Sequence, residues 1–592
     1  MPSEMPPRRS RETPEPALPQ ALPPFPEAGA PAGEAVQLVE MARDTSAADE
    51  QAAAGGRRRL IATAGVIAAG QLLSSVLGFV RIAVLNVLFY PVVSGTFLFA
   101  LRPIQQINDL LVGGSVSGAL IPTFVDHGEP ASREELRRIY STVANLVLIC
   151  MCVAVPLLIL AAPAIISLEI VRGGDSPQLT IQLVRLASFS LIGLGLFAAT
   201  SALLYALKQV VFPAFATGIY HVAIITCGVL ALLLAAYQLH LPLASIFSRG
   251  SASSEVLHAR ELAAPGLAIG AAVGALAEFA ILLPGLRRVG VQWRPVLDLR
   301  HPAVRQILRL YGPIAAGLVI SVLYQNLDLG LIGHTPNGWE ANNTALASGT
   351  VLTQFPVGLV AAALSFAVLP PLTAAANRAD LEGFKATLRH GIRLGLLLMV
   401  PAMVGLYVLR VPIVALLFQH GTCTHGCTVR NALAVQNYAY ELPFIALDQL
   451  LIAAFYARKN TLIPNIVAVV SILFYVVVAV PFHTSIGMPA LAFGDTAKNT
   501  SHALILFVLL TLAIGNLGMR DLLGGVGRIL VAGAAMWLAC WGVLMALPEA
   551  GPGAQLLLAG AVGTAVYFGV ILLLRVEEVH LIAEIVRRKL GR

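Results

Sequence analysis

After Arg59 the chain consists mainly of apolar runs of about twenty residues, and these runs limit the folds open to it. A helix needs about 20 apolar residues to cross the roughly 30 Å hydrocarbon core of a bilayer. Only 12% of the residues are charged, against about 25% in soluble domains. The sequence therefore predicts an all-α polytopic membrane protein with about 14 transmembrane helices. The predicted spans lie near residues 60–83, 94–124, 139–165, 178–205, 211–237, 264–285, 306–333, 343–370, 386–409, 431–457, 461–482, 487–514, 525–547 and 553–575.

Lysine and arginine are unevenly distributed among the connections between these spans. If the N-terminus is cytoplasmic, the connections on that side hold most of the basic loop residues, and the same side receives GGRRR before the first span and RRKLGR at the end of the chain. Cytoplasmic loops of membrane proteins carry such an excess. We therefore expect both termini in the cytoplasm. The modest excess of Lys and Arg, 39 against 32 acidic residues, follows from this bias and predicts no nucleic-acid partner.

Short sequence similarities indicate an internal repeat. IAAG occurs at 67–70 and 314–317, and YALKQVVFP at 205–213 resembles YARKNTLIP at 456–464. Ser117 and Ser365 each lie five residues before a proline, so three similarities recur in one order at nearly one offset. A unit with an even number of spans keeps its orientation, which predicts two six-helix lobes in parallel repeat, as in some transporters. The lobes would cover residues 57–285 and 306–514, with two further helices in 525–575.

Three segments outside the lobes have distinct compositions. Residues 1–56 are rich in Pro, Ala and Glu and have too few apolar residues for a packed core, which predicts a disordered cytoplasmic tail. Residues 286–305 alternate basic and apolar side chains, which is typical either of an amphipathic helix on the cytoplasmic surface or of a plain basic loop. Residues 576–592 predict a basic cytoplasmic tail.

Polar side chains within the second span point to a wet cavity. Arg102, Gln105, Gln106 and Asp109 are spaced so that they share one helical face. Arg81 lies in the apolar run LGFVRIAVLNVLF of the first span, with no acidic residue within one turn. Charged groups inside a membrane usually face water or a partner. We expect these five residues to line a substrate cavity, although Arg81 could instead extend toward the membrane surface.

A second polar group lies in the predicted second lobe. Asp328 lies within the seventh span, and Asp495, Lys498 and Asn499 follow at helical spacing in the twelfth. These residues are candidates for coupling to an ion, Na⁺ or H⁺. The alternative for Asp495 and Lys498 is a structural ion pair. No other cofactor is expected.

The loop FQHGTCTHGCTVR allows three interpretations. His420, Cys423, His425 and Cys427 are the residue types of a tetrahedral zinc site. The predicted topology places the loop outside the cytoplasm, where a Cys423–Cys427 disulfide would persist. Two unpaired cysteines are the third interpretation.

The chain contains no G-x-x-x-x-G-K-[ST] loop, no H-E-x-x-H and no G-x-S-x-G sequence. Its charged residues are dispersed over many spans rather than gathered in one catalytic group. This pattern favours a transporter and not an enzyme.

Several segments resemble the MurJ/MviN lipid II flippase family, part of the multidrug/oligosaccharidyl-lipid/polysaccharide exporter superfamily. They are SSVLGFVRIAVLNVLF with GGSVSGALIPTF, then VGALAEFAILLPGLRRVG, RQILRLYGPIAAG, QFPVGLVAAALSFAVLPPL and ALLFQHG, between about Ala62 and Thr500. The resemblance implies two lobes around a cationic cavity, and alternating access that moves a peptidoglycan precursor across the bacterial inner membrane. It also implies a groove for the lipid tail at the last two helices.

Only some of the arginines that the resemblance implies for the cavity are present in this sequence. Arg81 matches the arginine of a Gly-Phe-x-Arg segment, whereas Ser75, Ile107 or Asn108, and Val351 stand where arginines are expected. The implied function is export of lipid II in cell-wall biogenesis and cell-shape maintenance. Alternatives are another polyprenyl-linked saccharide as cargo, or a transport-inactive scaffold of the same fold. The implied partners are a polyprenyl-pyrophosphate-linked sugar, membrane lipid and cell-wall synthesis proteins, with the chain itself a monomer.

Overall fold

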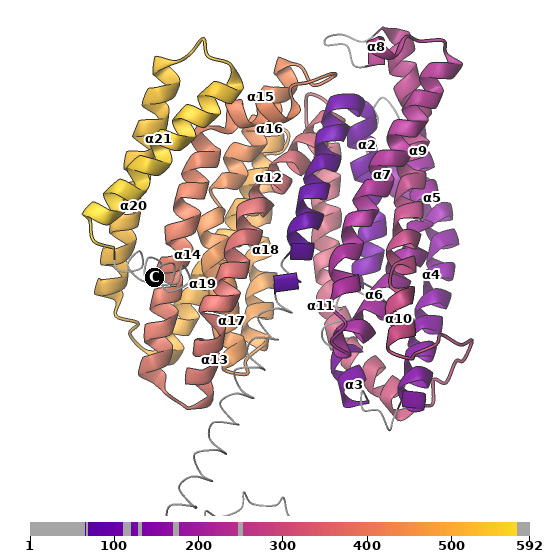
Figure 1. Cartoon of the computed structure of the whole chain (residues 1–592), viewed down its shortest axis with the longest axis horizontal. Coiled ribbons are helices and arrows are strands. Elements are labelled where there is room, and N and C mark those ends of the chain that lie inside the picture. Colours follow the sequence, from indigo (N-terminus) through magenta and orange to yellow (C-terminus); the bar gives the residue numbers. More distant parts are fainter. Residues whose placement is uncertain are drawn as a thin grey trace, which may run out of the picture. The chain divides into compact units, whose positions relative to one another are not determined.

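Every regular element in the described part of the computed structural model is a helix (Figure 1). The structure describes residues 65–66, 69–110, 120–127, 133–169, 177–246 and 253–576. The first helix covers Ala69–Phe89. The helices that follow in the N-terminal half are α2 (Val92–Asn108), α3 (Ile121–Asp126), α4 (Arg133–Glu169), α5 (Pro177–Ala187), α6 (Ser190–Ala206), α7 (Val211–Gln238), α8 (Leu243–Ile246), α9 (Ser254–Ala280) and α10 (Leu283–Arg288).

The C-terminal half is helical in the same way, and its labelled elements other than α11 occupy the left side of Figure 1, whereas α11 contacts α4 of the N-terminal half. Its last two helices, α20 and α21, pack on each other, and both contact α14. The helices are α11 (Pro302–Gly333), α12 (Trp339–Ala367), α13 (Leu369–Asn377), α14 (Leu381–Val408), α15 (Arg410–Phe418), α16 (His425–Ala439), α17 (Leu442–Ala457), α18 (Leu462–Phe482), α19 (Met488–Ile514), α20 (Met519–Ala546) and α21 (Pro552–Leu573).

Among the described residues, ten helices are long and apolar enough to cross a membrane, and α16 with α17 make an eleventh if this pair, bent by 40°, is one span. Helices also occupy at least part of each of the fourteen predicted segments. The prediction of an all-helical, multi-pass membrane protein is confirmed, whereas the count of fourteen spans stays a prediction.

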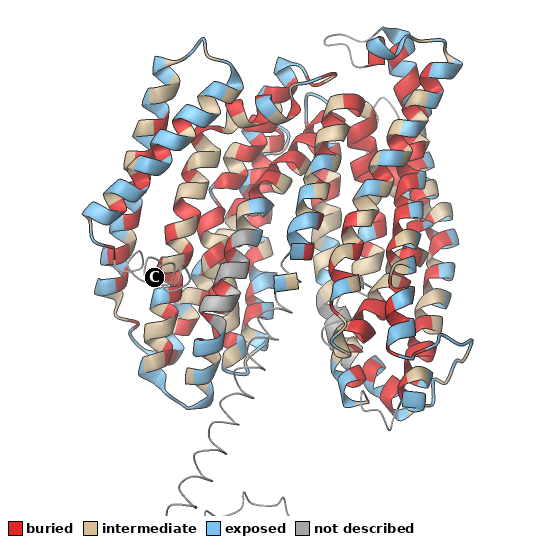
Figure 2. Ribbon diagram, viewed as in Figure 1, coloured by how far each residue is buried: buried red, intermediate tan, exposed pale blue. Residues whose placement is uncertain are grey.

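The outward faces of these helices carry large apolar side chains. Exposed residues lie along the outer surface in Figure 2 and buried ones lie between helices. Leu573 is 81% exposed and Leu512 is 77% exposed. In water such a surface would be unfavourable, but lipid tails solvate it, because they are as apolar as leucine.

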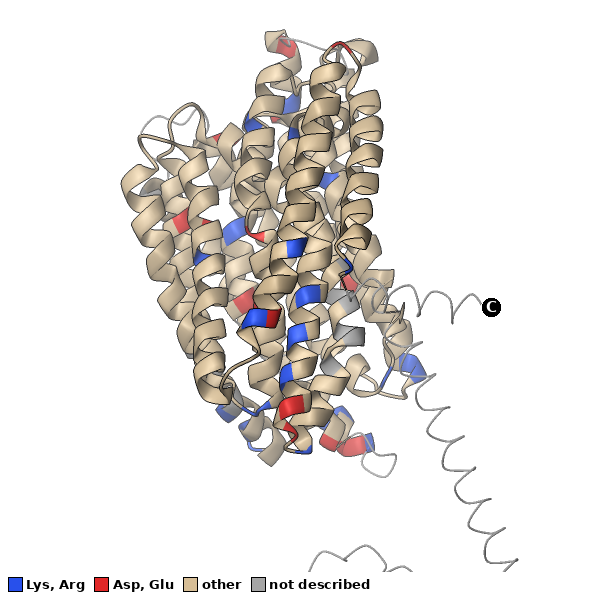
Figure 3. Ribbon diagram, turned by 90° about the vertical axis from the view of Figure 1, so that its left-hand side faces the viewer, with Lys and Arg blue, Asp and Glu red and all other residues tan. Residues whose placement is uncertain are grey.

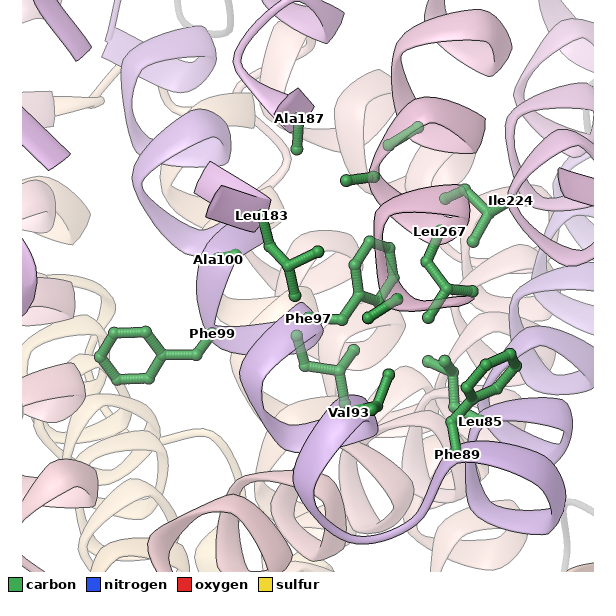
Figure 4. Packing of buried hydrophobic residues seen from close by; sticks show 14 of the residues in the cluster. Leu85, Phe89, Val93, Phe97, Phe99, Ala100, Leu183, Ala187, Ile224 and Leu267 are labelled. Atoms are coloured by element: carbon green, nitrogen blue, oxygen red, sulfur yellow. The ribbon is translucent and has the colours of Figure 1, made fainter. Parts of the chain in front are cut away.

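Small residues bring α7 and α9 into close contact. Gly266, Gly270 and Gly274 recur every four residues along α9, and a Cβ atom at Gly266 would lie 2.3 Å from the Cβ of Ala231 on α7. Glycine is common where membrane helices approach this closely. Beside this contact lies an apolar cluster with residues from helices of both halves, part of which Figure 4 shows. Its members include Leu85, Phe89, Val93, Phe97, Leu183, Ile224 and Leu267.

Polar side chains join the two halves of the chain at one end. Asn86 of the first helix donates to Ser348 Oγ of α12 at 2.9 Å, and the hydroxyls of Ser94 and Thr344 lie 2.9 Å apart. The loop after α15 reaches the same place, since Thr422 Oγ1 donates to the carbonyl of Asn86 at 2.9 Å. We call Asn86, Ser94, Thr344, Ser348 and Thr422 the polar seal. The loop-charge pattern predicts that this end faces away from the cytoplasm.

The connection between the two halves decides between the two alternatives that its sequence allows. α10 ends at Arg288 and α11 begins at Pro302, and the residues between them form no helix, so no amphipathic helix runs through 286–305 and the basic loop is the alternative that fits. The physical reason is that α4 binds the loop backbone. Asn145 Nδ2 donates to the carbonyls of Arg294 and Val296, at 2.8 Å each, and Arg138 Nη2 lies 2.9 Å from Asp298 Oδ2.

The predicted tails, residues 1–56 and almost all of 576–592, lie outside the described residues, as does Ser117 of the internal repeat.

Candidate functional site

Two cavities that contain charged side chains adjoin each other, and the second of them lies between the halves of the chain. The first has a volume of about 470 Å³ and is lined mainly by the first helix, α2, α6, α7 and α9. The second has a volume of about 430 Å³ and is lined by the first helix and α2 on one side and by α11, α12, α16 and α19 on the other. Arg81, Leu98 and Arg102 line both cavities. The two predicted cavity arginines therefore lie on the wall that the cavities share.

Arg81 has an incompletely satisfied guanidinium. Its Nε is buried without a hydrogen-bond partner, and no ion pair joins it to the described residues. Tyr220, His221 and Glu278 line the same cavity. A side chain that extended to the membrane surface would leave its guanidinium in water, whereas this one lines two internal cavities. The arrangement leaves a cation able to bind an anionic ligand.

Arg102 connects the two halves electrostatically. Its Nη1 lies 3.5 Å from Asp328 Oδ2 on α11. Asp328 is buried, and Tyr475 of α18 donates a hydrogen bond of 2.5 Å to its other oxygen. Arg102 is thus paired in this conformation, in contrast to Arg81.

Asp495 and Lys498 form an ion pair at one side of the second cavity. Lys498 Nζ lies 2.9 Å from Asp495 Oδ1, and also donates to Tyr324 OH at 2.8 Å. Tyr324 in turn donates to Asp495, and Tyr438 OH donates to the other carboxylate oxygen at 3.4 Å. The pair is therefore held by aromatic hydroxyls from α11 and α16.

The other predicted site residues divide between cavity and interior. Gln105 lines the first cavity and donates to Asp109 Oδ1 at 2.9 Å. Gln106 is buried, lies outside both cavity linings, and its amide nitrogen has no partner in the described structure. Asn499 donates to Glu441 Oε2 at 2.7 Å and does not line either cavity.

Cys423 and Cys427 form a disulfide, so the structure selects one of the three predicted alternatives. Both sulfurs are consumed by the bond and are not thiolate ligands. His420 and His425 are exposed, and no group of metal-binding side chains occurs among the described residues. The bridge closes the loop that Thr422 attaches to the polar seal.

The cavity residues expected from the sequence do not include Tyr220, His221 or Glu278. All three line the first cavity, and Glu278 is only 3% exposed. A histidine within the apolar run GIYHVAIIT of α7 is a signal that could have found His221. The convergence of α7 and α9 on Arg81 is tertiary and has no local signature.

Two positions where the family resemblance places arginines also face the cavities. Asn108 lines the first and Val351 lines the second, whereas Ser75 lines neither. Neutral side chains therefore stand at two cavity-lining positions where the resemblance implies arginines. Lys498 adds a cation on the opposite wall.

A helical membrane protein with a polar, arginine-lined cavity between its halves has the architecture of a transporter. Residues 84–554 match the family described as "Lipid II flippase MurJ". The chain belongs to this family.

Curated relatives extend the match over nearly their whole length. A "Probable lipid II flippase MurJ" of Bdellovibrio bacteriovorus is 24% identical over 529 residues, covering 88% of this chain and 96% of the relative. The protein of the same description from Vibrio cholerae is 24% identical over 545 residues, covering 88% and 97%.

Solved structures show the same fold. "Lipid II flippase MurJ, inward closed conformation" superimposes with a TM-score of 0.67 at 18% identity, over 89% of this chain and 99% of that one. An "inward-facing conformation of a multidrug resistance MATE family transporter" gives a TM-score of 0.52 at 15% identity, over 77% and 95%.

Proposed function

We propose that the protein moves lipid II, a lipid-linked peptidoglycan precursor, outward across the bacterial inner membrane. Family membership supports this cargo, and the match over most of the chain does not favour another saccharide or a transport-inactive scaffold. The observation that carries the proposal is Arg81, a cation on the wall of both cavities without an ion-pair partner in the described residues. Arginine suits a diphosphate because its planar fork donates two parallel hydrogen bonds.

The mechanism that we propose is alternating access. The second cavity lies between the halves and adjoins the first, while the polar seal closes one end. The diphosphate would enter on the cytoplasmic side and bind Arg81. Arg102 would join when its pair with Asp328 opens, because a doubly charged ligand competes with one carboxylate for the guanidinium. Loss of this pair would free α2 from α11 and allow the halves to rotate.

We infer a finer architecture from the repeat and the packing. Fourteen spans would form two lobes of six, over 57–285 and 306–514, with both termini cytoplasmic. α20 and α21 would hold the polyprenyl tail, and their exposed leucines support this placement, for example Leu557 at 74%.

We further propose a proton, rather than Na⁺, as the coupling ion. The Lys498 ammonium occupies the position next to Asp495, and Arg102 faces Asp328. A sodium ion needs several oxygen ligands and would be repelled by these cations. In reconstituted vesicles a pH difference should change the rate of headgroup translocation. A rate that follows a Na⁺ gradient instead would contradict this proposal.

Complementation tests the main function. In a bacterium depleted of its own flippase, the wild-type chain should restore growth and Arg81→Ala should not. Arg185→Ala is the matched control, because Arg185 also lies in a predicted span but lines neither cavity and donates to the carbonyl of Ile159 at 3.3 Å. Failure of the well-expressed wild type, or rescue by Arg81→Ala, would overturn the proposal.

A further inference from the structure

A third polar cavity lies away from the central pair. Its volume is about 190 Å³, and it lies between α14, the start of α20 and the residue three positions after α21. It shares no lining residue with the two central cavities. The transport mechanism above does not use it. Its lining is formed by Arg393, Arg520, Asp521, Gly524, Gly525, Arg528 and Val576.

This cavity carries more positive than negative charge. Arg393 is buried, and its Nη2 lies 2.7 Å from Asp521 Oδ1, while Arg389 Nε lies 3.5 Å from Asp521 Oδ2. One carboxylate thus faces two guanidinium groups. Arg520 and Arg528 are exposed and have no ion pair or hydrogen bond with any described residue. Figure 3 views this side of the molecule, where blue Lys and Arg segments follow one another along the lower half.

The two unpaired arginines lie on one face of α20, on either side of a glycine. Arg520, Gly524 and Arg528 recur every four residues and share one face of α20. Eight residues span about 12 Å of helix, and side chains lean toward the helix N-terminus, so Arg528 lies over the turn that contains Gly524. A Cβ atom at Gly524 would have no neighbour within 4 Å. The space beside Gly524, between the two arginine positions on the helix, is therefore open.

A second glycine lets α14 contribute to the same cavity. A Cβ atom at Gly525 would lie 2.6 Å from Arg393 Nε. The absence of a side chain there allows Arg393 to reach the α20 backbone, where it donates to the carbonyl of Asp521 at 2.6 Å. Two adjacent glycines therefore shape this cavity. Gly525 leaves space for the guanidinium of Arg393, and Gly524 leaves the neighbouring space open.

We propose that this cavity binds the phosphate of an anionic membrane lipid. Arginine clusters between membrane helices on the cytoplasmic side bind phosphorylated headgroups, and the loop-charge pattern places the start of α20 on that side. The positive end of the α20 dipole adds to the attraction. Apolar side chains continue from the cavity along the same face of α20, including Val531 and Leu538, which are 57% and 58% exposed. They provide a surface for the acyl chains, which favours a lipid over free phosphate.

Tryptophan quenching can measure this binding on the full-length protein. Trp537 and Trp541 lie on α20 and are 38% and 46% exposed. In nanodiscs of phosphatidylcholine, phosphatidylglycerol with brominated acyl chains should quench them at low mole fraction, and brominated phosphatidylcholine should not. Each arginine near a membrane surface contributes about a factor of five to anionic lipid binding. The double variant Arg520→Gln with Arg528→Gln should therefore need roughly 25-fold more phosphatidylglycerol for half-maximal quenching.

A matched control removes the same charge elsewhere. Arg305 and Arg309 are exposed, lie four residues apart on α11 at the same predicted membrane side, and line none of the three cavities. Replacing both by Gln should change the half-maximal mole fraction less than twofold. Gly524→Leu fills the cavity without changing charge and should weaken quenching as the arginine variant does.

Three results would overturn the proposal. The first is an equal increase, in the α20 and α11 double variants, of the phosphatidylglycerol mole fraction needed for half-maximal quenching. Such a result would indicate general attraction of anionic lipid to positive charge. The second is no shift in either, as expected if the chain's own Glu577 and Glu578 supply the anion. The third is displacement of the brominated lipid by inorganic phosphate at equal concentration, which would assign the cavity to free phosphate. None of these results depends on whether Arg81→Ala abolishes transport.

Discussion

At the residue scale, the cations of the central cavities differ in how far they are neutralised. Arg81 has no ion-pair partner in the described structure, Arg102 faces Asp328 at 3.5 Å, and Lys498 faces Asp495 at 2.9 Å. A bound anion therefore gains most from Arg81, because binding the other two requires an existing pair to open. This difference singles out Arg81 for the first contact with a diphosphate.

The Asp495–Lys498 pair should be strongly coupled in a double-mutant cycle. Its side chains are 22% and 20% exposed, and Tyr324 bonds both. We expect Asp495→Asn and Lys498→Met to destabilise the protein by about 1–3 kcal/mol each, and the double variant by less than their sum. Thermal unfolding in detergent measures the coupling.

Lys385 and Glu382 supply the control cycle for that measurement. They have the same spacing and the same 2.9 Å distance, but Glu382 is 84% exposed. Exposed pairs contribute at most about 1 kcal/mol. Equal coupling in the two cycles would show that the cavity environment does not strengthen the Asp495–Lys498 pair.

The spacing of residues in one helix predicted part of this site, and contacts between helices determined the rest. Arg102 and Gln105 could be placed on a cavity face because their positions follow from helical periodicity. Gln106 has the same spacing, yet it is buried outside both cavity linings, because α2 is covered on that side by other helices. His221 and Glu278 reach Arg81's cavity only because α7 and α9 pack closely there.

At the element scale, the polar seal is the contact that alternating access must break. It joins the first helix and α2 to α12 through short side chains, and a Cβ atom at Gly95 would lie 2.2 Å from the carbonyl oxygen of Glu340. Such an interface closes tightly, but it releases when a few neutral hydrogen bonds of about 1 kcal/mol each are exchanged for water. It is therefore suited to reversible closure.

A covalent bond across the polar seal should stop transport. The hydroxyls of Ser94 and Thr344 lie 2.9 Å apart, so the double variant Ser94→Cys with Thr344→Cys should form a disulfide in an oxidising environment. We expect the oxidised protein to lose headgroup translocation in vesicles and to recover it after reduction. The two single cysteine variants, treated alike, control for effects on the native Cys423–Cys427 bridge. Full activity of the cross-linked protein would contradict alternating access at this interface.

The loop between α10 and α11 shows why one element could not be predicted from sequence. Its alternation of basic and apolar residues is compatible with a helix. In the structure the Asn145 amide binds two of its carbonyls, and Trp293 Nε1 donates to Asn145 Oδ1 at 2.8 Å. In this loop, hydrogen bonds to α4 take the place of the backbone hydrogen bonds that a helix would make. They join distant parts of the chain, so the local sequence does not predict them.

At the scale of the whole molecule, the transport machinery lies within one compact unit. The chain divides into Met1–Gly65 and Val66–Arg592, and all residues that line the central cavities belong to the second unit. The family match over 84–554 falls within the same unit. A flippase should therefore not need the N-terminal segment for its activity, whereas a scaffold that recruits envelope enzymes through that segment would.

Deletion of residues 2–56 separates these two roles. The shortened chain keeps the three arginines at 57–59, which preserve the positive charge before the first helix and hence its orientation. We expect it to restore growth in flippase-depleted cells as well as the full chain does, at equal amounts in the membrane. Arg81→Ala in the shortened chain should abolish that rescue, because the cavity cation is still required. If the deletion abolished growth while headgroup translocation in vesicles stayed intact, the N-terminal segment would have a second, recruiting role in the cell.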